Sequence, residues 1–409
     1  MMPLTIKLAW RNLFRNRRRT LIAGTAIGIG LAALIFTDAL IQGMKAQMIE
    51  SATASYMGEG QIHRRGFRLS LETGLTIEDV AGLGAALSAD PAVEAFAPRA
   101  EGFGMVTSPA NVSSVMVIGV DPDRERALSR VDDNVREGDF FAGEEERDIV
   151  IGSDLAELLE VGLGDRVVVT VSQARSGDLS QDLFRVSGIY RFGVKEMDEG
   201  FAFVRLPKAQ RMLGIGDGLH EIALKFQDIG FASAKNDAFW ERYSAGGNEA
   251  VSWTILLPQL TGVLDMVWIS LAFMAVILFG VVAFGIINTL FMSLYERMFE
   301  FGVLRAVGTR SSGVRRLIVF EAGGLALLSI GLGTALGLAL TLAVSKTGID
   351  YRGIEFAGTA FTDLLYPVLE ARQFLVYPPA VFLFTLLVGV YPARVAGKMR
   401  VAEALRKSL

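Results

Sequence analysis

The chain has 409 residues and a net charge of −4; 51% of its residues are hydrophobic and 21% are charged. Soluble domains usually carry about 25% charged residues, so the composition indicates a membrane protein. The mild negative charge argues against a nucleic-acid surface. The absence of cysteine excludes disulfides, thiolate metal ligands and a cysteine nucleophile, and two histidines, His63 and His220, are too few for a histidine-rich metal site.

Residues 1–19 are predicted to form an amphipathic helix on the cytoplasmic side. One helical face is apolar and carries Ile6, Trp10, Leu13 and Phe14. Another face is basic and carries Lys7, Arg11, Arg15 and Arg18. Such a pattern is typical of a helix lying in the membrane interface. Anchoring is its main predicted role, and contact with a cytoplasmic partner is the weaker alternative.

Residues 20–43 are predicted to form the first membrane-spanning helix. The apolar run from 21 to 41 is interrupted by one acid, Asp38, near its end. About 20 apolar residues suffice to cross a hydrocarbon core of about 30 Å. A cleaved signal peptide is the competing interpretation, but its apolar core would be only about 7–15 residues long. The length therefore favours an uncleaved anchor.

Residues 44–260 are predicted to form one large α/β (α+β) domain outside the membrane, either as a single unit or as two subdomains. The predicted strands are residues 148–152, 166–172, 184–190, 200–206 and 221–226. The predicted helices are residues 75–89, 153–160, 207–213 and 228–243. Ser153 is the expected N-cap of its helix, and a proline at position 207 suits the start of another.

This domain shows no Ser/His/Asp triad arrangement and no cluster of metal ligands. Two acidic and basic runs, residues 121–126 and 144–148, are expected to be solvated loops. Paired carboxylates could perform acid–base chemistry, but no pocket signature flanks these runs. We therefore expect the domain to bind a partner, with no catalytic residue and no metal site.

Three further spans are predicted at residues 261–295, 317–344 and 374–393. Basic residues crowd the N-terminus, residues 296–316 and the tail at 394–409, whereas the loop at 345–373 mixes both signs of charge. Because cytoplasmic segments carry an excess of Lys and Arg, both termini are predicted to be cytoplasmic. The large domain then lies on the opposite side, in the periplasm or outside the cell, and the membrane is the cell (inner) membrane.

The segment at 296–316 is predicted to be a cytoplasmic coupling helix. Its polar residues are Glu296, Arg297, Glu300 and Arg305, and its apolar face carries Phe299, Val303, Leu304 and Val307. Gly308 permits a sharp helix end. A plain connecting loop would explain the arginines, but it would explain neither the two acids nor the apolar face. The pattern therefore predicts a docking element for a soluble partner.

This segment also carries a recognisable motif, Arg297-x-x-Glu300-x-Gly302-x-x-Arg305-Ala306-x-Gly308, followed by Glu321-Ala322 in the next span. Supporting patterns are Ala9-Trp10-Arg11-Asn12-Leu13, residues 149–165 and the closing Tyr391-Pro392-Ala393-Arg394. Together they resemble the FtsX/MacB/LolC–LolE class of ABC transporter permeases over essentially the whole chain.

The resemblance implies a dimer of permeases, each with four spans and one external domain after the first span. A separate ABC ATPase dimer would dock on the coupling helix and move the external domains by mechanotransmission. The resemblance places the contact with the ATPase on five residues, Arg297, Glu300, Gly302, Arg305 and Gly308. This sequence has no G-x-x-x-x-G-K-[ST] phosphate loop. ATP and Mg²⁺ are therefore expected in a partner chain, with no cofactor in this one.

Two pairs of glycines, four residues apart, lie within predicted spans. They are Gly24 with Gly28 in the first span and Gly333 with Gly337 in the third. Such pairs let helix backbones approach closely. Packing within one protomer is the simpler interpretation, and a dimer contact or lateral opening, suggested by the resemblance, is the alternative.

Three functions stay open at this point. The first is ATP-driven extraction or export of lipoproteins or other lipid-linked cargo. The second is MacB-like efflux or FtsX-like mechanotransmission with a periplasmic adaptor. The third, from a different class, is a membrane-anchored sensor or enzyme, which the coupling helix disfavours. The expected partners are the ATPase dimer, a second permease (a copy or a paralogue), membrane lipids and a lipoprotein cargo or an adaptor, but no nucleic acid.

Overall fold

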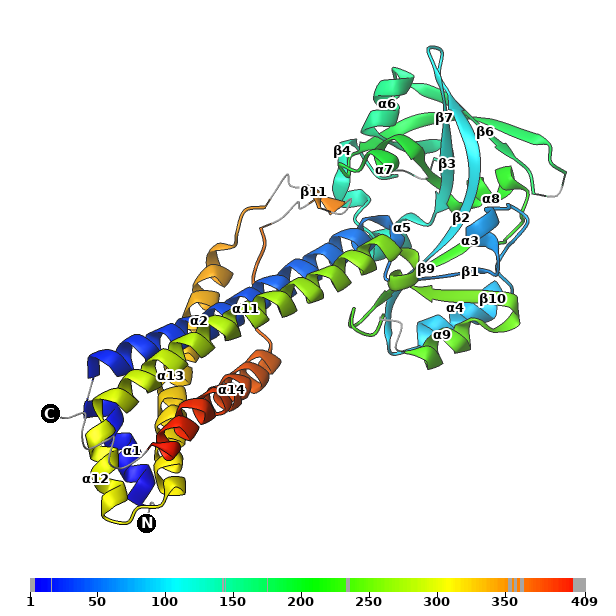
Figure 1. The fold of residues 1–409 in the computed structure, drawn as a ribbon. Coiled ribbons are helices and arrows are strands. Elements are labelled where there is room, and N and C mark those ends of the chain that lie inside the picture. Colours follow the sequence, from blue (N-terminus) through cyan, green and yellow to red (C-terminus); the bar gives the residue numbers. More distant parts are fainter. Residues whose placement is uncertain are drawn as a thin grey trace. The chain divides into compact units, whose positions relative to one another are not determined.

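A computed structural model describes residues 4–15, 17–141, 143, 145–174, 176–232, 236–351, 355–356, 359–360 and 364–399. The chain divides into two compact units (Figure 1). We call Met1–Ala46, Leu264–Tyr351 and Asp363–Leu409 the helical unit, and Gln47–Val263 with Arg352–Thr362 the sheet unit. The long helices α2 and α11 each have residues in both units.

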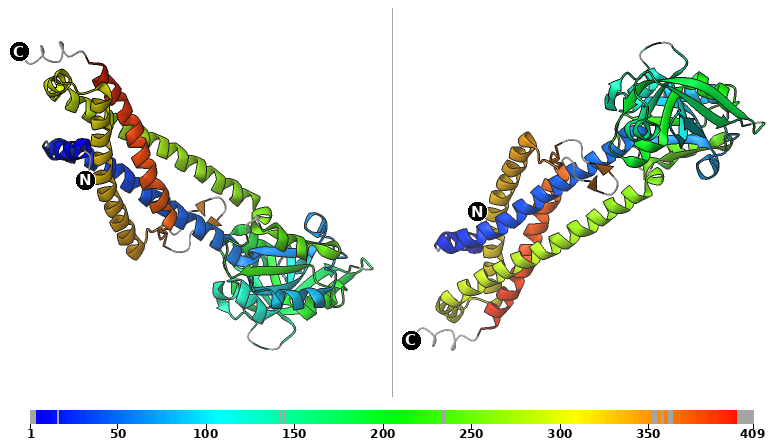
Figure 2. Two further views of the ribbon diagram at one scale, coloured as in Figure 1. Left: turned by 90° about the horizontal axis from the view of Figure 1, so that it is seen from below. Right: turned by 90° about the horizontal axis from the view of Figure 1, so that it is seen from above.

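The helical unit is built from long apolar helices joined by short turns. Its helices are α1 (Leu4–Arg15), α2 (Arg17–Ala52), α11 (Pro258–Glu296), α12 (Met298–Ala306), α13 (Ser311–Thr347) and α14 (Ala371–Lys398). Among the described residues, four helices are long and apolar enough to cross a membrane, namely α2, α11, α13 and α14. Figures 1 and 2 show α14 (red) beside α13 (yellow to orange).

Apolar side chains cover both the inside and the outside of this unit. Ile27, Ile35 and Ile286 are at most 1% exposed in its core. Phe273 and Phe284 of α11 are 67% and 77% exposed. Such outward aromatic surface is unfavourable in water but suits a lipid environment. The four spans of the predicted fold class are thereby confirmed.

The sheet unit holds one large mixed sheet. Within the described residues, ten strands form it in the order β10-β1-β9-β2-β3-β8-β5-β7-β4, with β6 pairing both β2 and β7. The strands are β1 (Gly60–Arg64), β2 (Val93–Thr107), β3 (Val112–Val120), β4 (Val135–Gly138), β5 (Asp148–Gly152), β6 (Arg166–Ser172), β7 (Leu179–Tyr190), β8 (Phe201–Arg205), β9 (Glu221–Phe226) and β10 (Asn248–Ser252). Because β6 bridges β2 and β7, part of the sheet closes into a ring around an apolar core. A separate hairpin pairs β11 (Glu355–Phe356) with β12 (Thr359–Ala360).

Short helices flank this sheet. They are α3 (Phe67–Ser70), α4 (Val80–Ala89), α5 (Pro122–Leu128), α6 (Ser153–Leu159), α7 (Lys195–Gly200), α8 (Leu206–Leu213), α9 (Asp237–Tyr243) and α10 (Trp253–Leu256). In the described part of the chain, three single turns accompany them, the π-turn η1 (Thr53–Met57) and the 3₁₀ turns η2 (Asp132–Asn134) and η3 (Ala245–Gly247). The α/β character predicted for the domain is confirmed.

All five predicted strands are present, and three of them, β5, β6 and β9, have the predicted bounds. The predicted helices at 153–160 and 207–213 correspond to α6 and α8. The prediction for Ser153 is wrong, because Gly152 has the extended backbone of an N-cap and Ser153 is already helical. The Ser153 hydroxyl instead lies 3.1 Å from a carboxylate oxygen of Asp154.

Two predicted helices begin later than expected. The helix predicted at 75–89 begins at Val80, because Asp79 caps it by accepting from the amide of Gly82 at 3.1 Å. The helix predicted at 228–243 is helical only from Asp237. Residues 228–232 form turns, and residues 233–235 lie outside the described part of the chain.

The expected loop at 121–126 is also wrong, because the segment forms helix α5. Asp121 caps this helix by accepting from the amides of residues 123 and 124. Glu125 is 0% exposed and lies against a buried arginine, Arg99. A charged run therefore forms part of the domain interior instead of a solvated loop.

Candidate coupling site

The chain changes direction at Arg297, between α11 and α12. This residue has φ −112° and ψ 15°, outside helical values. Its amide still contacts the carbonyls of Ser293 at 3.2 Å and Leu294 at 3.3 Å. Helix α12 thus starts as a separate element directly after the second candidate span.

The side chain of Arg297 is buried in a polar cluster that joins three elements. Its Nη1 donates to Oε1 of Glu321 in α13 at 2.5 Å, and its Nε donates to Glu300 in α12 at 3.0 Å. The amide of Asn12 in α1 donates to the same Glu321 oxygen at 2.7 Å. Burial alone would lower the pKa of Arg297, but the charge of Glu321 raises it overall. Arg297 is only 7% exposed and holds α12 and α13 together from within, and the bond from Asn12 to Glu321 adds α1 to the cluster.

Glu300 lies at the edge of this cluster. Its carboxylate contacts Arg15 of α1 at 2.8 Å as well as Arg297, and its side chain is 42% exposed. Partial burial raises its pKa, but hydrogen bonds from Arg15 and Arg297 lower it overall. Exposed ion pairs contribute little to stability. Glu300 therefore helps to orient α12 relative to α1, but it contributes little to the free energy of unfolding.

The inner face of α12 is apolar and tightly packed. Gly302 is buried beside Phe301, which is 2% exposed. The cluster around Phe301 brings together residues from α1, α11, α13 and α14, namely Ala9, Leu294, Val314, Leu317, Ile318, Ala393 and Ala396. The guanidinium of Arg297 also lies over the Phe301 ring, 4.9 Å from its centre. These contacts fix α12 on the helical unit.

The far end of α12 closes in a glycine turn. Arg305 donates through Nη1 to the carbonyl of Met399, beyond α14. Gly308 has φ 102°, a conformation that favours glycine. The amide of Thr309 bonds the carbonyl of Leu304 at 2.9 Å, which closes the helix end.

The outer face of α12 is apolar and exposed. Phe299 is 48% exposed, Val303 39%, Leu304 38% and Val307 83%. We call these four residues the α12 face. A contiguous apolar surface beside charged residues indicates an interaction site more than a random surface.

The five predicted coupling residues thus occupy different positions. Arg297 and Gly302 are buried, Glu300 and Arg305 are half-buried, and Gly308 is exposed in the turn. Asn12, Arg15 and Glu321 join the cluster but were not predicted as site residues. The signals for two of them, an Asn in the N-terminal motif and a Glu in the next span, were present in the sequence.

A cavity of about 200 Å³ with both polar and apolar lining adjoins the Arg297–Glu321 pair. Its lining comes from α1, α2, α11 and α13 and includes Asn12, Thr289, Ser293 and Leu325. A cavity of this size and polarity can hold several waters. In the part of the chain that the structure describes, no group of three or more acidic or histidine side chains could hold a metal ion.

The predicted glycine pairs lie where α2 crosses α13. A Cβ on Gly333 would lie 2.5 Å from the carbonyl oxygen of Gly28, and a Cβ on Gly28 would lie 3.1 Å from that of Ser329. A Cβ on Gly337 would lie 3.2 Å from Ala32 Cα, whereas one on Gly24 would have ordinary contacts. The two helices therefore approach within one chain.

Two family models match the chain. The MacB-like periplasmic core domain matches residues 20–234, and the FtsX-like permease C-terminal region matches residues 272–401. The first match alone covers more than half of the 409 residues. The boundary between the matches falls near the start of α11, and α12 lies inside the second.

Curated relatives match along nearly the whole chain. The lipoprotein-releasing system transmembrane protein LolC of Xylella fastidiosa is 23% identical over 99% of this chain and 99% of its own length. LolE of Haemophilus influenzae is 22% identical over 97% and 98%. The macrolide export ATP-binding/permease protein MacB of Bdellovibrio bacteriovorus is 26% identical over 97% of this chain and 60% of its own length. The chain therefore belongs to the FtsX/MacB/LolC–LolE family of ABC transporter permeases, with four membrane-spanning helices and one external domain.

Proposed function

We propose that this permease works with a separate ABC ATPase, which docks on the α12 face. The exposed apolar surface of Phe299, Val303, Leu304 and Val307 carries this proposal. It sits on a short helix whose inner side is fixed by Arg297 and Phe301. A displacement of α12 would therefore be transmitted to α1, α11 and α13 through these packed contacts.

We assign ATP and Mg²⁺ to the partner chain, because this sequence has no phosphate loop. The MacB relative, named an ATP-binding/permease protein, is longer than this chain, which spans 60% of it. A second permease, as a copy or a paralogue, completes the assembly. The basic residues that flank the spans support an inner-membrane protein whose two termini are cytoplasmic and whose external domain is periplasmic.

Lipid-linked proteins are the cargo class that we propose. Two relatives that this chain matches from end to end are named lipoprotein-releasing transmembrane proteins. Efflux or mechanotransmission with a periplasmic adaptor is the second candidate, which the MacB relative favours. The two differ in what co-purifies, either lipid-modified proteins or an elongated adaptor.

The first test is a mild-detergent purification from native membranes, read by mass spectrometry. We expect a soluble ABC ATPase to co-purify with the wild type. Val307→Asp should abolish its recovery, because a carboxylate would be buried in an apolar interface. Leu179→Asp is the matched control, since Leu179 is 69% exposed in the external domain. Undiminished ATPase recovery with Val307→Asp would rule out the α12 face as the docking site.

Cargo is tested by reconstitution. Proteoliposomes that contain the permease assembly and a lipid-modified protein should release that protein only with ATP. ATP-dependent activity without release, together with a co-purifying adaptor, would favour the second candidate.

A further inference from the structure

The helix that forms the first span ends inside the external domain. Helix α2 continues past Ala52 as the π-turn η1 and stops at Gly58, whose φ is 74°. The last carbonyls of any helix lack partners within it, and the helix dipole places partial negative charge there. The hydrogen-bond donors that bind these carbonyls therefore determine how firmly the helix end is held.

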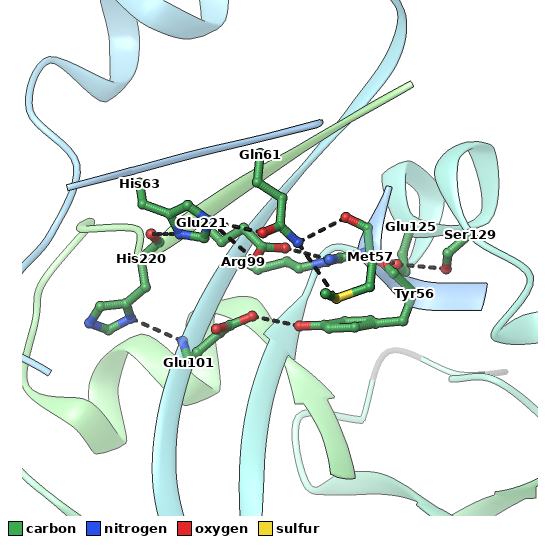
Figure 3. A network of polar contacts seen from close by, with 10 residues as sticks. All are labelled: Tyr56, Met57, Gln61, His63, Arg99, Glu101, Glu125, Ser129, His220 and Glu221. Carbon is green, nitrogen blue, oxygen red and sulfur yellow. Dashed lines mark hydrogen bonds and ion pairs between the residues drawn. The ribbon is translucent and has the colours of Figure 1, made fainter. Parts of the chain in front are cut away.

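Four carbonyls at this end have hydrogen-bond donors, one from the cap residue Gly58 and three from residues outside the helix. The amide of Gly58 donates to Thr53 at 2.8 Å, and the amide of Arg130 donates to Ala54 at 2.7 Å. The side chain of Gln61 donates to Met57 at 2.8 Å. The carbonyl of Tyr56 accepts from Nη2 of Arg99 at 2.7 Å (Figure 3). Arg99 comes from strand β2, so the sheet itself holds the helix end.

Arg99 is 0% exposed and is fixed from three sides. Its Nε and Nη2 donate to the two oxygens of Glu125 at 3.0 and 2.6 Å. Its Nη1 donates to Glu221 of β9 at 2.5 Å. Its guanidinium also lies 3.9 Å from the centre of the Tyr56 ring. The planar fork of arginine can serve several acceptors at once, which a lysine cannot do equally well.

The side chain of Tyr56 is held by the same strand. Its hydroxyl donates to Glu101 at 2.5 Å, and Glu101 lies two residues after Arg99 on β2 (Figure 3). The amide of Glu101 donates to Nδ1 of His220, which therefore carries its proton on Nε2 and donates to the Thr73 carbonyl at 2.8 Å. Two residues of strand β2 therefore bind Tyr56. Arg99 binds its backbone carbonyl, and Glu101 binds its side-chain hydroxyl.

Stability alone is a weak explanation for this arrangement. Buried ion pairs often contribute no more than well-packed apolar residues, because removing charges from water is costly. An apolar cluster would stabilise the sheet, but it could not bind the terminal carbonyl of a helix. We propose that Arg99 is the positioning residue that joins the first membrane-spanning helix to the external domain, so that displacement of the helix moves the domain. This inference rests on the proposed function for the origin of the displacement.

Arg99→Lys tests the joint in the full-length assembly. Lysine keeps a buried cation beside Glu125 and Glu221, but it cannot reach both carboxylates and the Tyr56 carbonyl. We expect amide hydrogen exchange in residues 53–61 to accelerate about tenfold, since exchange reports local opening. Cargo release per ATP hydrolysed should fall about fivefold while ATPase activity stays within about twofold of wild type.

Lys208→Arg is the matched control. Lys208 is another buried cation of the same domain, paired with Asp182 and distant in sequence from the helix end. It should leave both the exchange of residues 53–61 and the release ratio unchanged. If Arg99→Lys does not fold, Tyr56→Phe removes only the hydroxyl bond to Glu101 and should produce the same changes at smaller size.

Faster exchange in residues 53–61 with an unchanged release ratio would overturn the inference, as would unchanged exchange. An assembly without ATPase activity would instead overturn the proposed function. The exchange experiment would still decide whether Arg99 holds the helix end, so the two failures are distinguishable.

Discussion

Arg297 and Glu321 form a buried ion pair, 2.5 Å between Nη1 and Oε1, that connects the start of α12 to the third span. The two side chains are 9% and 6% exposed. Glu321 also accepts from Asn12 at 2.7 Å, so each partner has a second contact. The pair places a charged contact at the start of the element that we propose to receive force from the ATPase.

Arg297→Met should destabilise the protein by about 3 kcal/mol, because it leaves Glu321 buried without its cation. The double variant Arg297→Met with Glu321→Leu should recover much of this loss, since neither charge then remains. Thermal unfolding in detergent measures both. Arg316→Met, at an exposed position on α13, is the control and should change little. A double variant no more stable than the single one would contradict this account of the pair.

Alanine at the glycines between α2 and α13 should have graded effects. Gly333→Ala should be the most damaging, because its Cβ would lie 2.5 Å from a backbone oxygen, followed by Gly28→Ala at 3.1 Å. Gly24→Ala should be nearly neutral, since its nearest contact, Ser329 Oγ, would be 3.6 Å away. Gly331→Ala is the control in α13, with nothing within 4 Å. The melting temperature in detergent reports the order, and equal effects at Gly333 and Gly331 would refute it.

A dimer contact at the same glycines can be tested by placing a larger side chain at Gly28. Gly28→Leu should destabilise the protomer without dissociating a dimer if the crossing with α13 is the sole role of Gly28. Loss of the dimer in a protomer that stays folded would instead favour the alternative interpretation.

Gly308→Ala should weaken the turn after α12. Its φ of 102° is strained for any residue with a Cβ, and such strain costs about 1–3 kcal/mol. We expect reduced ATPase recovery in the purification described above, with only a modest loss of thermal stability. Gly285→Ala in α11, with nothing within 4 Å of the new Cβ, should leave both unchanged. Full ATPase recovery with Gly308→Ala would show that the turn is not needed for docking.

Stability of the external domain should depend on pH through Glu101. The pKa of Glu101 is raised from 4.5 to about 7, mainly by burial and also by the nearby charge of Glu221, although the hydrogen bond from Tyr56 lowers it. Because the folded pKa is raised, the protonated form contributes stability below about pH 4.5 that is lost as the pH rises through 7. The loss is at most about 3 kcal/mol.

Glu101→Gln should flatten this dependence between about pH 4 and 8, a range that brackets the window, because glutamine still accepts from Tyr56. Unfolding followed by intrinsic tryptophan fluorescence measures it. Glu94→Gln, at a partly exposed position, should retain the wild-type slope. An equal slope in wild type and Glu101→Gln would exclude Glu101 as the source.

Features that depend on local pattern were predicted well. The four spans followed from the length of their apolar runs, and β5 and β6 followed from short β-branched segments between turns. Strands β2 and β3 were missed, because β2 contains glycine, proline and charged residues whose burial depends on strands far away in sequence. The late start of α4 also escaped prediction, since it depends on Asp79 adopting a φ of 50°.

Burial of charge was the part that the sequence could not predict. Glu125 looked solvated because its partner Arg99 is 26 residues away and Glu221 is 122 residues from Arg99. Similarly, the motif identified Arg297 but not its orientation, because Glu321 reaches it only after α12 and α13 have folded back. The α12 face was predicted from helical periodicity, and its four residues are exposed as that pattern requires.

Helix α2 runs unbroken from Arg17 to Ala52, with Gly28 packed against α13 and Tyr56 just beyond its end. An α-helix turns by about 100° and advances by about 1.5 Å with each residue. Tyr56 and Arg99 both belong to the sheet unit, whereas Gly28 belongs to the helical unit. One residue inserted between positions 28 and 46 would therefore leave each contact in place and would lengthen the helix between them by about 1.5 Å. Continuity of this helix, and not the exact number of its residues, is the property that connects the two contacts.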